Sequence, residues 1–428
     1  MAFKHYDVVR AASPSDLAER ITQKLKEGWQ PYGSALISTA GYGAEFIQPV
    51  VSEGSISSPE EPGNRPTTSA PSVAPEYYYV IALAGQSNGM SYGEGLPLPD
   101  TFDSPDPRIK QLARRSTVTP GGAACIYNDI IPADHCLHDV EDMTGLNHPK
   151  ADLSKGQYGC VGQGLHIAKK LLPFIPANAG ILLVPCCRGG SAFTTGTDGT
   201  YSDTTGASES STRWGVGRPL YKDLIGRTKA ALAKNPKNVL LAVVWMQGEF
   251  DFNGTPANHA ARFTEVVDQY RADLADMAGQ CVGGSADSVP WICGDTTYFW
   301  KQKNETAYQT VYGSYKNKTE KNIHFVPFMT DENGVNVPTN KPEEDPDIPD
   351  IGYYGSKWRT DRSTWTSQDR ASHFSSWARR GIISDRLATA ILSCAGKSSA
   401  FVNGTAGVVV PDRPVTTSES VIFYDAKK

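Results

Sequence analysis

The chain has 428 residues, of which 39% are hydrophobic and 20% are charged, and its formal net charge is -5. This size and composition indicate a globular chain with a large core and more than one domain. The acidic balance gives no indication of a nucleic-acid partner, and no apolar run approaches the roughly 18 residues that a membrane-spanning helix needs. The amino-terminal segment lacks the apolar core of a secretory signal, so we expect cytoplasmic synthesis, with release by lysis or a periplasmic location as alternatives.

Residues 1–51 are predicted to form a small α+β module. Its expected elements are a strand at residues 6–9, a helix that begins at residues 13–16, and two further strands around residues 36–37 and 46–47. Leu17, Ile21 and Leu25 recur at helical spacing and predict the buried face of the helix. The module contains no group of catalytic residue types. This favours an accessory or assembly role, with a partner that the sequence does not identify.

Residues 52–76 are rich in Ser, Pro, Glu and Thr and contain almost no large apolar residue. Such a segment cannot bury enough surface to offset the entropy lost on ordering it, so we expect a flexible linker. The first module is therefore expected to move relative to the rest of the chain.

Residues 77–398 alternate between predicted strands and helices, which is the pattern of an α/β fold with a central, mainly parallel sheet. The strands are expected at residues 77–85, 179–186, 239–246, 290–293 and 323–327, and the helices at residues 161–174, 219–234, 261–277, 304–315 and 373–392. Two long irregular segments, residues 88–158 and 330–367, interrupt this pattern, and loops of such length usually carry function. Residues 399–428 alternate apolar and turn residues and predict a β-rich tail or the start of a further domain.

The eight cysteines contain no Cys-x-x-Cys pair and no spacing typical of a zinc site. We expect them to be reduced and mostly buried, with Cys281 and Cys293, or Cys125 and Cys136, able to pair only in an oxidising compartment. The histidines of the long segment 88–158 match no zinc pattern either. No zinc site is therefore expected.

Four short segments carry polar residue types that are common in catalytic sites. Residues 85–88 (Gly-Gln-Ser-Asn), 187–191 (Cys-Arg-Gly-Gly-Ser) and 245–251 (Trp-Met-Gln-Gly-Glu-Phe-Asp) come at the ends of predicted strands, and residues 372–375 (Ser-His-Phe-Ser) stand at the entry to the last predicted helix. Ligands of open α/β sheets bind outside the carboxyl ends of the strands. By itself the first segment favours a simple turn, but the four together predict a site built from serine, glycine, glutamine and histidine.

With these four segments the chain resembles the SGNH (GDSL-type) esterase superfamily, in the branch that carries Gly-Gln-Ser-Asn and Trp-x-Gln-Gly-Glu-x-Asp. Within that branch it is most similar to the bacterial sialate O-acetylesterases that act on N-acetyl-9-O-acetylneuraminate, over residues 76–392. The module at residues 1–51 resembles one found at the front of prophage-encoded members. The resemblance implies a three-layer SGNH-hydrolase fold. It also implies a serine esterase that removes the 9-O-acetyl group of sialic acid through an acetyl-serine intermediate, without a cofactor.

The resemblance implies Ser87 as the nucleophile and His373 as the base. The backbone N–H groups of Ser87 and Gly190 and the side-chain amide of Gln247 are the expected oxyanion donors. Glycine suits this role because a residue without Cβ lets the backbone approach the substrate oxygen. For Gly190 and Gln247, turn geometry or a hydrogen bond at a strand end is the alternative.

The last segment departs from the pattern of the superfamily, which is Asp-x-x-His. The residue three before His373 is Arg370, and Asp369 lies one place further back. The related sialate esterases share this arginine, which implies a Ser-His dyad in which a backbone carbonyl holds the imidazole Nδ1–H. We favour this dyad over a triad with Asp369.

Charged residues close to these segments have expected roles of their own. Sialic acid carries a carboxylate, which guanidinium groups bind well, so Arg188 and Arg370 are the candidate substrate-binding residues. An exposed surface ion pair is the alternative for each. Glu249 and Asp251 are expected to hydrogen-bond within the site scaffold, because two free carboxylates beside a developing oxyanion would be unfavourable.

Two other functions stay open at this point. One is deacetylation of another polysaccharide, such as acetylxylan or a bacterial O-antigen, by the same site. The other is a phage glycan-binding module that has lost catalysis, although the presence of Ser87, Gln247 and His373 argues against it.

Overall fold

The computed structural model describes residues 5–11, 14–31, 36–38, 45–52, 74–90, 93–94, 105–114, 125–133, 160–328, 372–374 and 378–395. The chain divides into two compact units, Met1–Ser72 and Val73–Lys428. The boundary falls inside the segment that was predicted to be a linker. Most of that segment, and the whole of the predicted tail at 399–428, lie outside the described residues.

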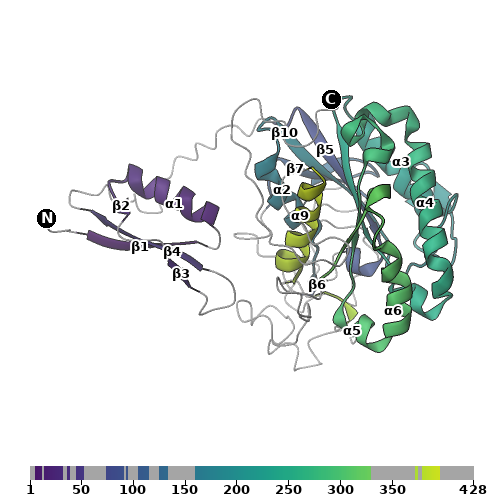
Figure 1. Ribbon diagram of the computed structural model, residues 1–428. Coiled ribbons are helices and arrows are strands. Elements are labelled where there is room, and N and C mark those ends of the chain that lie inside the picture. Colours follow the sequence, from purple (N-terminus) through teal and green to yellow (C-terminus); the bar gives the residue numbers. More distant parts are fainter. Residues whose placement is uncertain are drawn as a thin grey trace. The chain divides into compact units, whose positions relative to one another are not determined.

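The first unit is an antiparallel sheet with one helix (Figure 1). Its elements are β1 His5–Ala11, α1 Pro14–Lys26, β2 Gln30–Pro31, β3 Leu36–Ser38 and β4 Glu45–Ser52. Strand β4 pairs with each of the other three strands. The core contains Val9, Leu17, Trp29 and Val50, with Ile21 packed against them. Leu25 is 49% exposed, so its predicted place on the buried face is wrong.

The second unit is built on a seven-stranded sheet with the strand order β15-β14-β13-β5-β10-β7-β8. Its strands are β5 Tyr77–Gly85, β7 Ile109–Leu112, β8 Ile130–Pro132, β10 Ala179–Cys187, β13 Val239–Met246, β14 Trp291–Gly294 and β15 Ile323–Val326. All neighbouring strands run parallel except β7 and β8. The three central strands are buried almost throughout, as expected for continuous apolar runs in a parallel sheet. The predicted mainly parallel α/β fold is confirmed.

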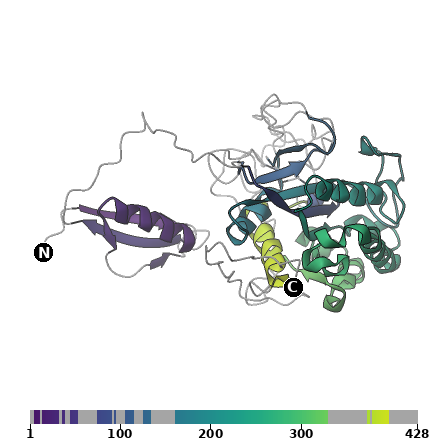
Figure 2. The same cartoon turned by 90° about the horizontal axis from the view of Figure 1, so that it is seen from above.

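Helices cover both faces of this sheet (Figures 1 and 2). Helices α2 Gly164–Leu171 and α9 Ser384–Cys394 pack together on one face, and α3 Pro219–Ala233 and α4 His259–Asp273 lie on the other. The short helices α5 Tyr298–Lys303 and α6 Glu305–Val311 follow β14. The apolar stripe predicted on the helix after β13 is fully buried and consists of Phe263, Val266, Val267, Tyr270 and Leu274. In the described ranges, no helix is long and apolar enough to cross a membrane.

Some local predictions need correction. Strands β7 and β8 lie inside the segment 88–158, which was predicted to be irregular, because Ile-Lys-Gln-Leu is too short and too polar to stand out as a strand. His373 itself is not helical, although a helix was predicted from this residue, and the described part of the last helical stretch runs from Ala378 and includes a π-helical turn at Arg379–Ile383. Cys281 and Cys293 are both buried free thiols.

The chain order places a topological switch at β5. From β5 the chain reaches β10 on one side, and it then crosses to β13 on the other side. Cys187 and Met246 are both register partners of Gly85, so the three strands end at the same level. Open α/β sheets bind ligands in the crevice at such a point. The segments that follow these strands are three of the four predicted site segments.

Candidate active site

The turn after β5 is fixed by its contact with the end of β13. Gly85 has φ +129°, and a Cβ at this position would lie 2.0 Å from the carbonyl oxygen of Met246, so no other residue fits. The next backbone N–H, of Gln86, donates to the same oxygen at 2.7 Å. Ser87 then opens a short 3-10 turn and is 6% exposed. The close approach of two strand ends thus delivers the predicted nucleophile to the carboxyl edge of the sheet.

The neighbouring Asn88 joins this turn to the segment that carries His373. Its Nδ2 donates to the carbonyl of Ser372 at 3.1 Å, and its Oδ1 accepts the backbone N–H of Phe374 at 3.2 Å. Both residues that flank His373 are therefore held by the residue next to Ser87. The structure brings together the segments of the two predicted catalytic residues.

His373 is partly buried, and its Nδ1 lies 3.2 Å from the hydroxyl of Ser372. The indole Nε1 of Trp300 donates to the Ser372 carbonyl at 3.0 Å, as Asn88 also does. Asp369, the alternative partner of the imidazole, lies outside the described residues. Ser372 and Trp300 were not singled out from the sequence, although Ser372 stands directly beside the predicted base.

The loop after β10 packs against the end of β5. The backbone N–H of Arg188 and the hydroxyl of Ser191 both donate to the Gly85 carbonyl, at 3.0 and 3.2 Å. Gly190 has φ +65°, but a Cβ there would meet only the Phe250 ring, at an ordinary 3.5 Å. The left-handed backbone, rather than lack of space in the protein, is what requires glycine. Among the described residues, the backbone N–H groups of Ser87 and Gly190 donate to no acceptor and so are available to an anion.

Gln247 is fully buried and uses both hydrogens of its amide within the protein. Nε2 donates to the Ser191 carbonyl at 3.2 Å and to Asp251 Oδ2 at 2.9 Å. A strand-end hydrogen bond was the alternative to an oxyanion donor at this position, and it is the arrangement present in this conformation. To donate directly to a substrate, the amide would have to give up one of these bonds.

Asp251 is an acceptor for the loop after Gly190. Its carboxylate accepts the backbone N–H groups of Phe193 and Thr194 and the Thr194 hydroxyl, at 2.7 to 3.2 Å. Burial alone would raise the pKa of Asp251, but the hydrogen bond and charge of His259, with the bonds from Thr194 and Gln247, outweigh it and lower the pKa to about 2. The prediction that this carboxylate belongs to the scaffold is confirmed.

Glu249 has a similar scaffold role. Its Oε1 accepts from Asn88 Nδ2 at 2.8 Å and from the Thr296 hydroxyl at 2.7 Å. Burial raises its pKa, against the opposing effect of these hydrogen bonds. Glu249 therefore supports Asn88, and through it the position of the His373 segment.

Arg188, one of the two predicted substrate-binding arginines, is not found at an open surface. Arg188 has no exposed area, and its Nη1 donates to the Glu209 carbonyl at 3.1 Å. This placement gives no support to a direct contact with a substrate carboxylate. For Arg188 the alternative, an exposed surface ion pair, is wrong, because the side chain is buried. Arg370 lies outside the described residues.

An aromatic surface borders the site and was missed by sequence reasoning. Phe250 is 38% exposed, its ring lies beside Gly190, and its ring centroid is 6.4 Å from that of Trp300. The only sequence signal is that Phe250 fills the variable place before Asp251 in its segment. Among the described residues, no group of three His, Cys, Asp or Glu side chains could hold a metal ion.

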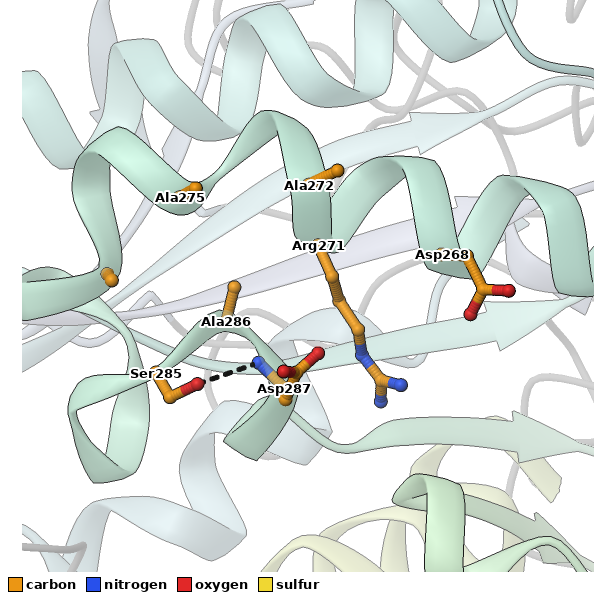
Figure 3. A pocket seen from close by; sticks show the side chains of 8 residues that line it. Asp268, Arg271, Ala272, Ala275, Ser285, Ala286 and Asp287 are labelled. Atoms are coloured by element: carbon orange, nitrogen blue, oxygen red, sulfur yellow. Dashed lines mark hydrogen bonds between the residues drawn. The ribbon is translucent and has the colours of Figure 1, made fainter.

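A groove with a volume of about 460 Å³ lies along the second half of α4 (Figure 3). Its lining includes Asp268, Asp287 and Arg271, whose Nη2 donates to the carbonyls of Lys321 and Val289 at 2.7 and 3.4 Å. These carbonyls stand just before β15 and β14, at the amino edge of the sheet. The groove is therefore at the opposite edge from Ser87 and takes no part in the site.

The comparison with protein families identifies a carbohydrate esterase. Residues 78–327 match the family described as "Carbohydrate esterase, sialic acid-specific acetylesterase", and the chain belongs to this family of carboxylic ester hydrolases. The family expected from the four sequence segments is thereby confirmed. Residues 3–53 match a domain of unknown function, DUF1737.

Two relatives illustrate the similarity. The chain is 55% identical over 321 residues, 75% of its length and 97% of the relative, to a "Probable 9-O-acetyl-N-acetylneuraminic acid deacetylase" of Escherichia coli (strain K12). The crystal structure of NanS matches with a TM-score of 0.68 and 55% sequence identity. The match covers 75% of this chain and 98% of that structure.

Proposed function

We propose that this protein is a serine esterase that hydrolyses the 9-O-acetyl ester of N-acetylneuraminic acid and releases acetate. The observation that carries the proposal is the double hydrogen bond of Asn88 to the backbone on both sides of His373, which unites the nucleophile and base segments. The substrate is supported by the 55% identity to a probable deacetylase of this sugar. We include in the proposal the SGNH type of three-layer fold, which the helices on both faces of the sheet support.

The reaction follows from the groups at the strand ends. Ser87 Oγ attacks the acetyl carbonyl carbon while His373 accepts the hydroxyl proton. The tetrahedral oxyanion binds the backbone N–H groups of Ser87 and Gly190, which have no acceptor among the described residues. His373 then gives the proton to O9 of the sugar as the C–O bond breaks, leaving acetyl-Ser87. Water attacks this ester by the same steps, releases acetate and restores the serine.

The imidazole of His373 is oriented without a required aspartate in this proposal. Ser372 contacts Nδ1 through its hydroxyl at 3.2 Å, and the backbone around the imidazole is held by Asn88 and Trp300. The described contact of Nδ1 is thus with a hydroxyl, whereas a backbone carbonyl was expected, and it supports a dyad without a carboxylate. Arg370 remains the proposed partner of the sugar carboxylate. The buried position of Arg188 suits a structural role instead.

The test is acetate release by the wild type and by Ser87→Ala from two substrates, 9-O-acetylated N-acetylneuraminic acid and acetylated xylan. The expected result is rapid release from the sialic acid by the wild type only, with little release from xylan. Equal or faster release from xylan would assign the enzyme to another polysaccharide. Absence of release from both substrates and from a chromogenic acetate ester would favour a non-catalytic glycan-binding module.

A further inference from the structure

A closed ring of hydrogen bonds lies behind the site and begins and ends at Gln247. The Gln247 side chain donates to Asp251 Oδ2 at 2.9 Å, and the same oxygen lies 2.9 Å from Nδ1 of His259. Nε2 of His259 lies 2.7 Å from the hydroxyl of Tyr315, which donates to the Gln247 carbonyl at 2.7 Å. All four residues have 0% exposure. His259 and Tyr315 have no role in the reaction described above.

The ring members hold the loop that follows Gly190. Gln247 donates to the Ser191 carbonyl, and Asp251 accepts two backbone N–H groups and one hydroxyl from Phe193 and Thr194. The loop residues that these bonds hold are all within four positions of Gly190 in the sequence. The ring therefore fixes the backbone that carries a proposed oxyanion donor.

Both imidazole nitrogens of His259 have a partner in this hydrogen-bonded ring. The Tyr315 hydroxyl has one hydrogen, which lies on the bond to the Gln247 carbonyl, so Nε2 of His259 must donate its own hydrogen. Nδ1 faces a carboxylate and also donates. Both sides of the imidazole are therefore engaged, one by the Asp251 carboxylate and one by the Tyr315 hydroxyl. Loss of one partner from such a buried pair is costly, since a buried polar group is left without its hydrogen bond.

The surroundings keep the ring rigid. Trp245, two residues before Gln247, donates from Nε1 to the Tyr315 hydroxyl at 3.1 Å. Its indole also contacts Trp214 and Trp291, with centroids 5.0 and 5.7 Å away. Such aromatic pairs each contribute on the order of 1 kcal/mol beyond their burial. The ring atoms thus have little freedom to adopt other partners.

We propose that His259 and Tyr315 are positioning residues of the esterase, acting through Asp251 and Gln247 to hold the Gly190 N–H where the oxyanion forms. The inference rests on the proposed function. An oxyanion donor acts mainly in the transition state, and a displacement of about 1 Å can cost on the order of a hundredfold in rate. Loosening the ring should therefore lower kcat and leave KM nearly unchanged.

Tyr315→Phe tests the proposal, because it removes the hydroxyl and leaves the aromatic side chain otherwise unchanged in size. Tyr270→Phe is the matched control: Tyr270 is also fully buried, and its hydroxyl donates to Thr228 on the neighbouring helix at 3.0 Å, away from the site. We expect Tyr315→Phe to lower kcat for 9-O-acetylated sialic acid about tenfold or more with KM within about twofold. The control should keep the kcat of the wild type. Thermal unfolding should register a loss of stability in both variants, larger for Tyr315→Phe because its hydroxyl takes part in three hydrogen bonds and that of Tyr270 in one.

A second pair of variants examines His259. Asparagine can place an N–H near the position of Nδ1 and keep the bond to Asp251, whereas leucine cannot. We expect His259→Asn to retain several times more kcat than His259→Leu. If the leucine variant does not fold, the comparison of the two tyrosine variants still decides the matter.

The outcomes separate this inference from the proposed function. If the wild type releases acetate and Ser87→Ala does not, but Tyr315→Phe has the same kcat as Tyr270→Phe, the positioning role is wrong and the esterase stands. A rise in KM with unchanged kcat in Tyr315→Phe would also overturn it. If the wild type releases no acetate from any ester, both proposals fall.

Discussion

Asn88 brackets His373: its amide donates to the carbonyl before the histidine and accepts the N–H after it. Glu249 takes the second Nδ2 hydrogen at 2.8 Å, so the amide has no freedom to turn over. The distance between the proposed nucleophile and base thus depends on a side chain that performs no chemistry itself.

Asn88→Ala should lower kcat on the order of a hundredfold, because the His373 segment loses both bonds that fix it against the Ser87 turn. Asn238→Ala is the matched control. Asn238 is also fully buried and bridges two backbone groups, Tyr78 N–H and Ala231 O, but at the amino end of β13. The measurement is kcat on a chromogenic acetate ester together with the midpoint of urea unfolding. Equal kcat losses in the two variants would mean that Asn88 acts only through stability.

Asp369→Asn should leave most of the activity, whereas His373→Ala should remove nearly all of it, because the proposed dyad needs no carboxylate at the imidazole. Ser372→Ala should have a modest effect, since its hydroxyl is 3.2 Å from Nδ1 while its carbonyl stays bound to Asn88. Steady-state kcat values of the three variants provide the check. A loss from Asp369→Asn as deep as that from His373→Ala would establish the triad.

Arg370→Ala should raise KM for 9-O-acetylated sialic acid about tenfold or more, because the sugar carboxylate loses a charged partner. KM for p-nitrophenyl acetate, which carries no carboxylate, should stay the same. Arg188→Ala should instead lower the unfolding temperature, because it removes a fully buried side chain that donates to the Glu209 carbonyl. A selective rise of KM in Arg188→Ala alone would return the carboxylate-binding role to that residue.

The stability contributed by Asp251 should depend on pH. Its pKa is lowered to about 2 from the ordinary 3.8, so its ionised form stabilises the folded state. This contribution, about 2 kcal/mol, is complete above the ordinary pKa and is lost as the pH falls toward 2. The free energy of urea unfolding should therefore favour the wild type over Asp251→Asn at pH 6, by a margin that shrinks below pH 4. A margin that does not change with pH would refute the assignment.

The central strands could be predicted because their sequences are compatible with few other secondary structures. Strands β10 and β13 are continuous apolar runs that end in small or polar residues, and Val239–Met246 has the predicted bounds. The edge strand β7, Ile109–Leu112, has two polar residues of four and gives no such signal. On α1, spacing alone cannot reveal that Trp29 completes the core while Leu25 faces solvent.

The sequence motifs predicted which segments form the site, but not the contacts between them. The four segments identified the family, but the partners that make them a site are remote in sequence: Asn88 and Phe374 are 286 residues apart, and His259 and Tyr315 are 56 apart. Arg188 shows another limit of the sequence: a charge in a site segment suggests contact with substrate, and the sequence does not reveal that the side chain is buried. Hydrogen bonds within the site depend on which segments the fold places side by side.

The union of Asn88 with the chain around His373 also has a consequence during synthesis. The turn that carries Ser87 leaves the ribosome long before His373 is synthesised. Until then the Asn88 amide lacks the backbone groups on either side of His373 that it binds in the folded protein. A nascent chain could complete the three middle strands and still cleave no ester. Activity should therefore appear only after the segment around His373 has been translated and has docked against Asn88, well after the central strands are complete.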